Sequence, residues 1–290
     1  MKALTCEMCG STNLIKEGGV FVCQSCGTKY SLEEAKKMMV EGTVDVKGTV
    51  KLDNTDELKN LYEIARRAKE TNNSENACKY YDMILVKDPQ SWEANFFVIY
   101  YKAMSCKIAE ISLAAQRIQN AIPSVLDLVK KIENEEEQKE AIKEIYVRCA
   151  IIADMLHGAA INHYEGIDVQ IKNKYTQECV NNCIAAVDIL NILGGEIESK
   201  FGEKYGLYAA QCWEKAIILH NKVMKYIEVE SKESNRQFMI KQADRAKKYD
   251  PNYVMPTIDM KDHGPGCVQI AIVIIVVLLA AAGIIIPIFM

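Results

Sequence analysis

The spacing of hydrophobic residues changes twice along the chain, and these changes divide it into segments. Alternating residues over 14–16 and 20–22, joined by a turn with two glycines, predict a β-hairpin, and residues 28–30 predict a third short strand. From residue 55 to about 250 the apolar residues recur every three or four positions, which predicts helices. The predicted fold class is therefore mainly α, with a small N-terminal β domain.

Two short segments connect the predicted strands to the predicted helices. Ser31 and Glu34 have the spacing of a capping box, which predicts a short helix that ends near Gly42. In residues 41–54, valine and leucine alternate with charged residues. This pattern fits either a small hairpin or an extended linker.

The first two predicted helices form a hairpin. Their apolar faces comprise Leu58, Leu61, Tyr62, Ala65 and Ala68, then Ala77, Tyr80, Tyr81, Ile84 and Leu85. Asn72-Asn73 separates the two helices, and the second ends at Asp88-Pro89. Small residues at Ala65 and Ala77 let the helices approach each other, and the aromatic Tyr81 fills the space between them.

Longer and less regular helices follow the first hairpin. We expect them at 92–107, at 124–134 after Pro123, from Glu135 to about 155, at about 168–193, at 205–226 and at 233–249. Gly194-Gly195 is predicted to end the fourth of these. The sequence Lys-Tyr-Asp-Pro at 248–251 repeats the Lys-Asp-Pro of 87–89, so residues 55–250 are predicted to form a solenoid-like helical array.

The last 23 residues, 268–290, carry no charge. As a helix they would extend about 34 Å, slightly more than the hydrocarbon core of a bilayer. The alternative is a buried core helix, but such helices rarely continue so far without a charged position. The sequence therefore predicts a C-terminal, single-pass membrane anchor, with residues 251–267 as a linker rich in proline and glycine and the bulk of the chain in the cytoplasm.

Two matched cysteine pairs lie at the N-terminus. Cys6 and Cys9 are followed by Gly10, Cys23 and Cys26 are followed by Gly27, and 13 residues separate the two motifs. Four thiolates at such a spacing suit a tetrahedral Zn²⁺ ion, and because they complete its coordination shell the zinc is predicted to be structural. The alternatives are a redox pair or scattered free thiols.

Residues 4–30 resemble a zinc ribbon of the transcription factor IIB type, although the gap between the pairs is shorter than the usual 15–20 residues or so. Residues 58–89 resemble a tetratricopeptide repeat, with Ala65, Ala77, Tyr81 and Pro89 at the motif's small, small, aromatic and proline positions. Ala68 departs from that motif, which usually has an aromatic residue there. The whole chain is similar to bacterial membrane proteins that join a zinc ribbon to a tetratricopeptide-like region.

Composition limits the functional classes. The net charge of the chain is −4. Residues 1–40 hold five lysines, four glutamates and no arginine, so a zinc-loaded ribbon would be slightly negative and poorly suited to neutralise phosphates. Eleven cysteines, an odd number dispersed along a long chain, fit a reducing compartment better than a disulfide framework.

Several other residues are candidate sites. Cys179 and Cys183, with His157 and His163, could form a second metal site, but buried free thiols are the commoner outcome. Cys267 could be acylated. The remaining cysteines, Cys78, Cys106, Cys149 and Cys212, are predicted to lie in the core.

The chain contains no phosphate loop, nucleophile elbow or metalloprotease motif. We therefore expect a non-enzymatic, tail-anchored adaptor that binds protein partners through the array and the ribbon. The alternatives are a regulator that contacts nucleic acid or the transcription machinery, and an enzyme with an unrecognised helical active site.

Overall fold

The computed structural model describes residues 6, 8–9, 11–17, 19–31, 34–35 and 55–261. The chain divides into two compact units, Met1–Asn54 and Thr55–Met290, each with its own apolar cluster. The predicted hairpin or linker at 41–54 lies outside the described residues, as do residues 262–290.

The N-terminal unit contains a three-stranded antiparallel sheet in the order β1-β2-β3. Strand β1 is Leu14–Glu17, β2 is Val20–Cys23 and β3 is Lys29–Tyr30. Gly19, with a φ of +89°, provides the positive φ that the tight turn between β1 and β2 requires. The hairpin and the third strand predicted from the alternating pattern are thus confirmed.

The predicted capping box after the third strand is also present. The Ser31 backbone N–H donates to Glu34 Oε2 at 2.8 Å, and the Glu34 N–H donates to Ser31 Oγ at 3.2 Å. These reciprocal bonds satisfy two backbone donors that would otherwise lack partners where a helix begins.

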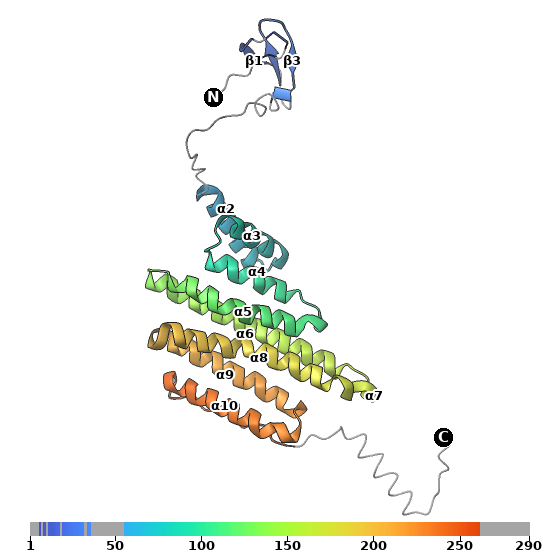
Figure 1. Cartoon of the computed structure of the whole chain (residues 1–290), viewed down its shortest axis with the longest axis vertical. Helices are drawn as coiled ribbons and strands as arrows, with labels where there is room; N and C mark the ends of the chain where they lie inside the picture. Colours follow the sequence, from blue (N-terminus) through green and yellow to red (C-terminus); the bar gives the residue numbers. More distant parts are fainter. Residues whose placement is uncertain are drawn as a thin grey trace, which may run out of the picture. The chain divides into compact units, whose positions relative to one another are not determined.

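The second unit is helical (Figure 1). Its longer helices are α2 (Thr55–Glu70), α3 (Ser74–Lys87), α4 (Trp92–Met104), α5 (Ile111–Lys130), α6 (Glu135–Glu165), α8 (Thr176–Phe201), α9 (Gly206–Val223) and α10 (Val229–Tyr249), and α7 (Val169–Lys172) is a single turn. Within residues 55–261 they pair as consecutive hairpins, α2 with α3, α4 with α5, α6 with α8 and α9 with α10. Helices α4, α6 and α9 pack side by side in one layer, and α5 packs on α8 in the other.

The first hairpin packs as its small residues predict. Ala65 of α2 and Ala77 of α3 are both fully buried. Tyr81 is also fully buried and stacks on Phe97 of α4, with ring centroids 4.9 Å apart. The tyrosine therefore connects the first hairpin to the second.

Pro123 does not begin a helix, contrary to prediction. It lies inside α5, whose residues follow one uninterrupted apolar face on both sides of it. Ile122 and Val125 are both buried beside the proline. A proline inside a helix costs about 3 kcal/mol, and burial of this continuous face offsets that cost.

Gly194 and Gly195 do not end a helix either, because α8 continues to Phe201. A Cβ atom at Gly194 would lie 2.7 Å from Nε1 of Trp213, so this glycine allows α9 to approach α8 closely. The chain reverses instead at Gly202, where φ is +56°. The sequence pattern did not distinguish a glycine that ends a helix from one that permits close packing.

One stretch of described helix, Val169–Tyr226, is long and apolar enough to cross a membrane by length and composition. It is not one straight helix, since it reverses at Gly202 and its two halves, α8 and α9, pack on each other. Of its most apolar stretch, 56% is buried inside the array, as expected of core helices. The predicted tail anchor at 268–290 lies outside the described residues.

Residues 251–261 are more than a linker. They follow α10 without regular secondary structure and lie against the array, where Tyr253, Met255 and Ile258 pack on its core. We call this segment the C-terminal strap. Its sequence contains prolines and apolar residues but little glycine, which suits an extended segment packed on a surface. The part of the predicted linker beyond Lys261 lies outside the described residues.

Candidate metal centre

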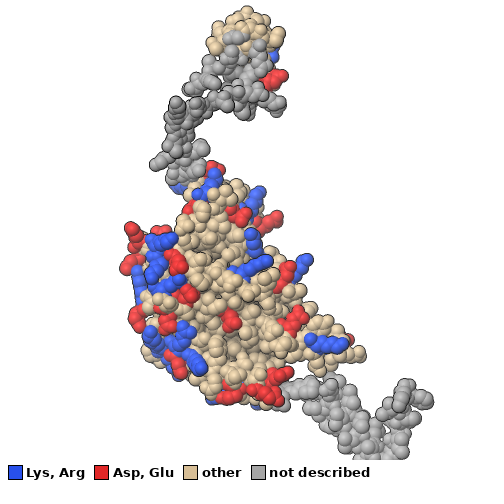
Figure 2. Space-filling model, in the orientation of Figure 1, with Lys and Arg blue, Asp and Glu red and all other residues tan. Residues whose placement is uncertain are grey.

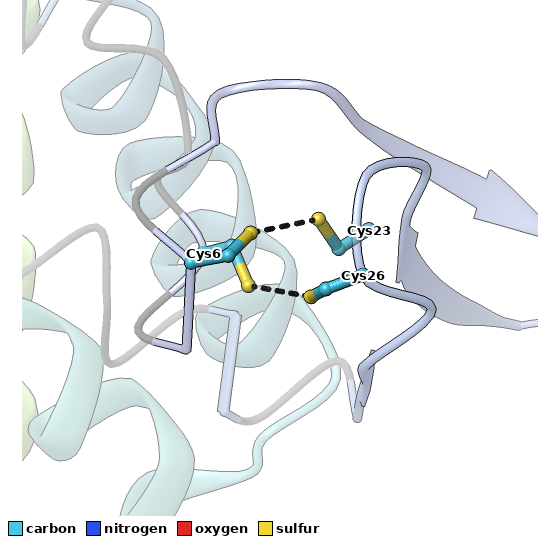
Figure 3. A group of neighbouring side chains, drawn as sticks. Cys6, Cys23 and Cys26 are labelled. Carbon is cyan, nitrogen blue, oxygen red and sulfur yellow. Dashed lines mark hydrogen bonds between the residues drawn. The ribbon is translucent and has the colours of Figure 1, made fainter.

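Four cysteine side chains converge at one end of the small sheet. Cys23 ends β2, Cys26 lies in the turn before β3, and Cys6 and Cys9 precede β1. Figure 3 shows Cys6, Cys23 and Cys26 with their sulfur atoms directed toward one another. All four Sγ atoms lie within 4.8 Å of one another, so the structure brings together the four residues predicted to bind a metal.

The spacing of the sulfur atoms fits a tetrahedral ion. With metal–sulfur bonds of about 2.3 Å, the edges of a regular tetrahedron of sulfur atoms are about 3.8 Å long. Sγ of Cys6 lies 3.5 Å from Sγ of Cys26, and Sγ of Cys9 lies 3.6 Å from Sγ of Cys23. The donor set contains soft sulfur atoms alone, which favours ions such as Zn²⁺ over Mg²⁺ or Ca²⁺.

Backbone hydrogen bonds fix the two cysteine loops. The N–H of Cys6 donates to Ser11 O at 2.8 Å, and the N–H of Cys23 donates to Thr28 O at 2.9 Å. Gly27, with a φ of +75°, closes the second loop by donating its N–H to Cys23 O at 2.8 Å. Main-chain hydrogen bonds therefore position both cysteine loops.

Local hydrogen bonds favour the thiolate form at two of the four sulfurs. The Tyr30 hydroxyl, 3.1 Å from Cys6 Sγ, lowers the pKa of the Cys6 thiol to about 6. The backbone N–H of Cys26 lowers the pKa of the Cys23 thiol in the same way. Tyr30 is buried against Cys6, so it packs inside the ribbon and does not present a ring for stacking on a base.

The pKa of Cys9 shifts in the opposite direction. The backbone N–H of Ser11 favours its thiolate, but the nearby thiols of Cys26 and Cys23 raise its pKa to about 12. Four clustered sulfurs cannot all ionise unless a cation compensates their charge. A divalent ion would supply that charge and hold all four as thiolates.

Cys179 and Cys183 do not form a second metal site with His157 and His163. The thiols of Cys179 and Cys183 donate to main-chain carbonyl oxygens of α6, at 3.7 and 3.8 Å. His157 is buried and His163 is exposed, and neither joins these thiols in a group of potential ligands. A cavity of about 10 Å³ lined in part by Cys179 and His163 has room for about one water molecule.

The other cysteines predicted to be in the core are placed as expected. Cys149 and Cys212 are fully buried, and burial raises the pKa of each thiol. Cys78 and Cys106 are partly buried and pack against the core. Cys267 lies outside the described residues.

A partly buried charge network in the array was not predicted from the sequence. The Glu93 carboxylate accepts hydrogen bonds from Tyr81 Oη at 2.6 Å and from Arg66 Nη2 at 2.7 Å. Lys69 Nζ lies 3.1 Å from Glu144 Oε1 and 4.0 Å from Glu93 Oε1. The network joins α2, α3, α4 and α6 and pairs both carboxylates with cations, so we interpret it as structural. Nothing in the sequence distinguished Glu93 from an ordinary glutamate in the first turn of a helix.

The visible surface of the array has no stripe of one charge. In Figure 2, positive and negative side chains are interspersed along one edge, and much of the face toward the viewer is uncharged. Charged residues of the array also form ion pairs, such as Lys200 with Glu196 at 3.4 Å and Lys204 with Glu135 at 2.9 Å. This face therefore lacks the continuous basic surface that binding to a nucleic-acid backbone requires.

Comparison with known proteins identifies no relative for this chain: no protein family, curated protein or solved structure matches it.

Proposed function

We propose that the chain is a non-enzymatic adaptor that is anchored in a membrane by residues 268–290 and that binds protein partners through its helical array and a structural zinc ribbon. The observation that carries this proposal is the convergence of the four cysteine sulfurs within 4.8 Å. The four ligands complete a tetrahedral shell and leave no position for a reacting water.

Zinc is the ion that best accounts for the ribbon. The described cluster around Cys6, Cys23 and Tyr30 is far too small to hold a fold by apolar burial alone. Zinc binding contributes about 10–16 kcal/mol in small domains of this kind, and that energy stabilises the fold. The ion would therefore fix the shape of the ribbon as a contact surface.

The helical array suits protein binding. Its consecutive hairpins form two layers with a continuous core, which leaves the outer helix faces for a partner. The packing of Ala65, Ala77 and Tyr81 supports a tetratricopeptide-like first hairpin. Solenoids of such hairpins present extended surfaces, and a membrane anchor would raise the local concentration of both modules for partners at that membrane.

Photo-crosslinking in intact membranes tests this proposal. A photoreactive residue at Ile15, which is 47% exposed on β1, would report proteins that touch the ribbon. We expect the full-length chain to float with liposomes and to capture the same partners repeatedly. The variant Cys23→Ser should lose that capture, because it removes one of the four ligands.

The matched control is Cys106→Ser, a partly buried cysteine of the array outside the metal centre. It should leave capture unchanged. Equal capture by Cys23→Ser and the unaltered chain would contradict the role of the ribbon, and nucleic acid as the main captured species would favour the alternative function. A full-length chain that does not float with liposomes would contradict the anchor.

A further inference from the structure

Two connections between helices lie side by side at one end of the array. The first, residues 166–175, joins α6 to α8 and includes α7, and the second, residues 224–228, joins α9 to α10. The Tyr226 hydroxyl donates to the Glu165 carboxylate, and the Tyr226 and Tyr164 rings meet edge to face with centroids 5.2 Å apart. Figure 1 shows α7 at this end of the stacked helices. The two connections therefore form one surface.

Exposed apolar side chains gather on this surface. Val169, Ile171 and Tyr175 belong to the first connection, Val229 is the first residue of α10, and Met260 lies in the C-terminal strap. Each of these side chains is between 38% and 66% exposed. We call the five together the apolar end.

The connections at the opposite end of the same helices are polar. Residues 131–134 precede α6, and residues 202–205 precede α9. The residues exposed there all have charged or amide side chains: Lys131, Glu133, Asn134, Glu203 and Lys204. Neither of these two described connections exposes a large apolar side chain. The apolar end is therefore not a general feature of the loops of this array, and clustered apolar exposure of this kind marks a contact surface.

The C-terminal strap brings the chain back to the apolar end. Lys232, in the first turn of α10, donates from Nζ to the carbonyl oxygen of Lys261. Six residues, 262–267, separate Lys261 from the proposed membrane anchor at 268–290. Even fully extended, that stretch of chain reaches no more than about 25 Å. An anchored chain therefore holds this end of the array close to the bilayer.

The charges at this end favour an uncharged bilayer surface over an anionic one. The Glu165 carboxylate pairs with one lysine from each connection, so neither lysine is free to attract an anionic headgroup. Glu228 and Glu230 are exposed beside the second connection and outnumber the exposed Lys174 of the first. Tyrosine and aliphatic side chains suit the boundary between headgroups and acyl chains. The surface thus fits a neutral phospholipid.

We propose that the apolar end rests on the bilayer that holds the anchor, with its five side chains inserted among neutral lipid headgroups. This inference rests on the proposed adaptor function and deepens it, because it gives the array one orientation on the membrane. Insertion removes exposed apolar surface from water, and the short tether raises the effective concentration of lipid at this end. The helices then stand with one end on the membrane, and their outer faces remain accessible to protein partners.

Fluorescence quenching in vesicles tests this contact. The full-length chain is reconstituted in phosphatidylcholine, with lipids brominated in their acyl chains as the quencher. Val169→Trp places an indole at the apolar end, and the matched control Val86→Trp places one in the last turn of α3, at a position that is 83% exposed. The signal of the native Trp92 and Trp213 is measured in the unaltered chain and subtracted. We expect brominated lipid to reduce the fluorescence of the Val169→Trp indole at least twofold and to leave that of the control unchanged.

A second measurement follows the neighbouring connection. The indole of Val229→Trp should also be quenched, and adding Val169→Asp/Ile171→Asp should reduce that quenching at least twofold, because two carboxylates oppose insertion of the same surface. Equal quenching of the Val169→Trp and Val86→Trp indoles, or quenching of Val229→Trp that the aspartates leave unchanged, would overturn the inference.

Flotation of the same vesicles measures the anchor independently. A chain that floats with the vesicles but shows no quenching at the apolar end would refute this inference and leave the adaptor function in place. A chain that does not float would refute the anchor, and both proposals would fail with it.

Discussion

The contact between the start of α9 and the end of α10 depends on a glycine at 206. This residue has ordinary helical φ and ψ angles of −55° and −32°, so alanine would not strain the backbone. Its Cβ atom, however, would lie 2.1 Å from Cδ1 of Tyr249, far inside van der Waals contact. The Tyr249 ring would have to move, although it stacks on Trp213 and its hydroxyl donates to Glu198 Oε1 at 3.0 Å.

The expected loss of stability in Gly206→Ala follows from these contacts. Overpacking costs about 1–3 kcal/mol, loss of the Tyr249 hydrogen bond costs about 1 kcal/mol, and the better helix propensity of alanine returns up to about 1 kcal/mol. We therefore expect Gly206→Ala to lower the free energy of unfolding by about 1–3 kcal/mol. Gly158→Ala is the matched control, because a Cβ atom there would meet nothing within 4 Å. It should be neutral or stabilise α6 by up to about 1 kcal/mol.

Thermal unfolding followed by circular dichroism measures the difference. In a domain of this size each kcal/mol shifts Tm by about 2–4 °C, so Gly206→Ala should melt about 2–12 °C below the unaltered chain. In the Tyr249→Ala background the Gly206→Ala change should cost much less, because the obstructing ring is absent. If Gly206→Ala and Gly158→Ala melted alike, the packing of α9 on α10 described above would be wrong.

Three further predictions concern the metal, a buried carboxylate and a buried imidazole. Chelation of the metal should unfold the ribbon and leave the Tm of the array unchanged, since the two units have separate cores. Glu93→Gln should lower the free energy of unfolding, measured with urea, by about 1–2 kcal/mol, because the hydrogen bond from Tyr81 loses its charged acceptor. The control Asp82→Asn, in an exposed ion pair, should change it by less than about 0.5 kcal/mol. Burial lowers the pKa of His157 to about 4, so protonation of this imidazole opposes folding. The free energy of unfolding should therefore fall as the pH drops from about 6.5 toward 4, and the loss should be about 2 kcal/mol at pH 5. His157→Gln should flatten that dependence in urea unfolding, and His163→Gln, at an exposed position of the same helix, should not.

The cluster of four cysteines was predictable because the residues that position it are close together in the sequence. The spacing of the two cysteine pairs and the turn between β1 and β2 determine where the sulfurs converge, and the structure places all four within 4.8 Å. The helical period likewise predicted that residues 55–250 are mainly helical and that the first two helices form a hairpin. These features depend on residues close together in sequence.

The errors occurred where tertiary contacts decide the outcome. Pro123 and Gly194 are strong local signals for a helix boundary, yet both lie inside helices because an apolar face or a neighbouring tryptophan determines the packing. The strap resembled a linker because its prolines exclude a helix, and it packs through contacts with residues distant in sequence, such as Asn221 on α9. The partners of Glu93 come from two other helices, α2 and α3, which a linear pattern does not bring together.

The metal content of the purified full-length chain tests the central claim most directly. Elemental analysis should find one zinc ion per chain, and Cys9→Ser should lose it while Cys78→Ser, a cysteine of the array, retains it. A chain that folds with no bound metal, or that holds equal zinc in both variants, would contradict the account.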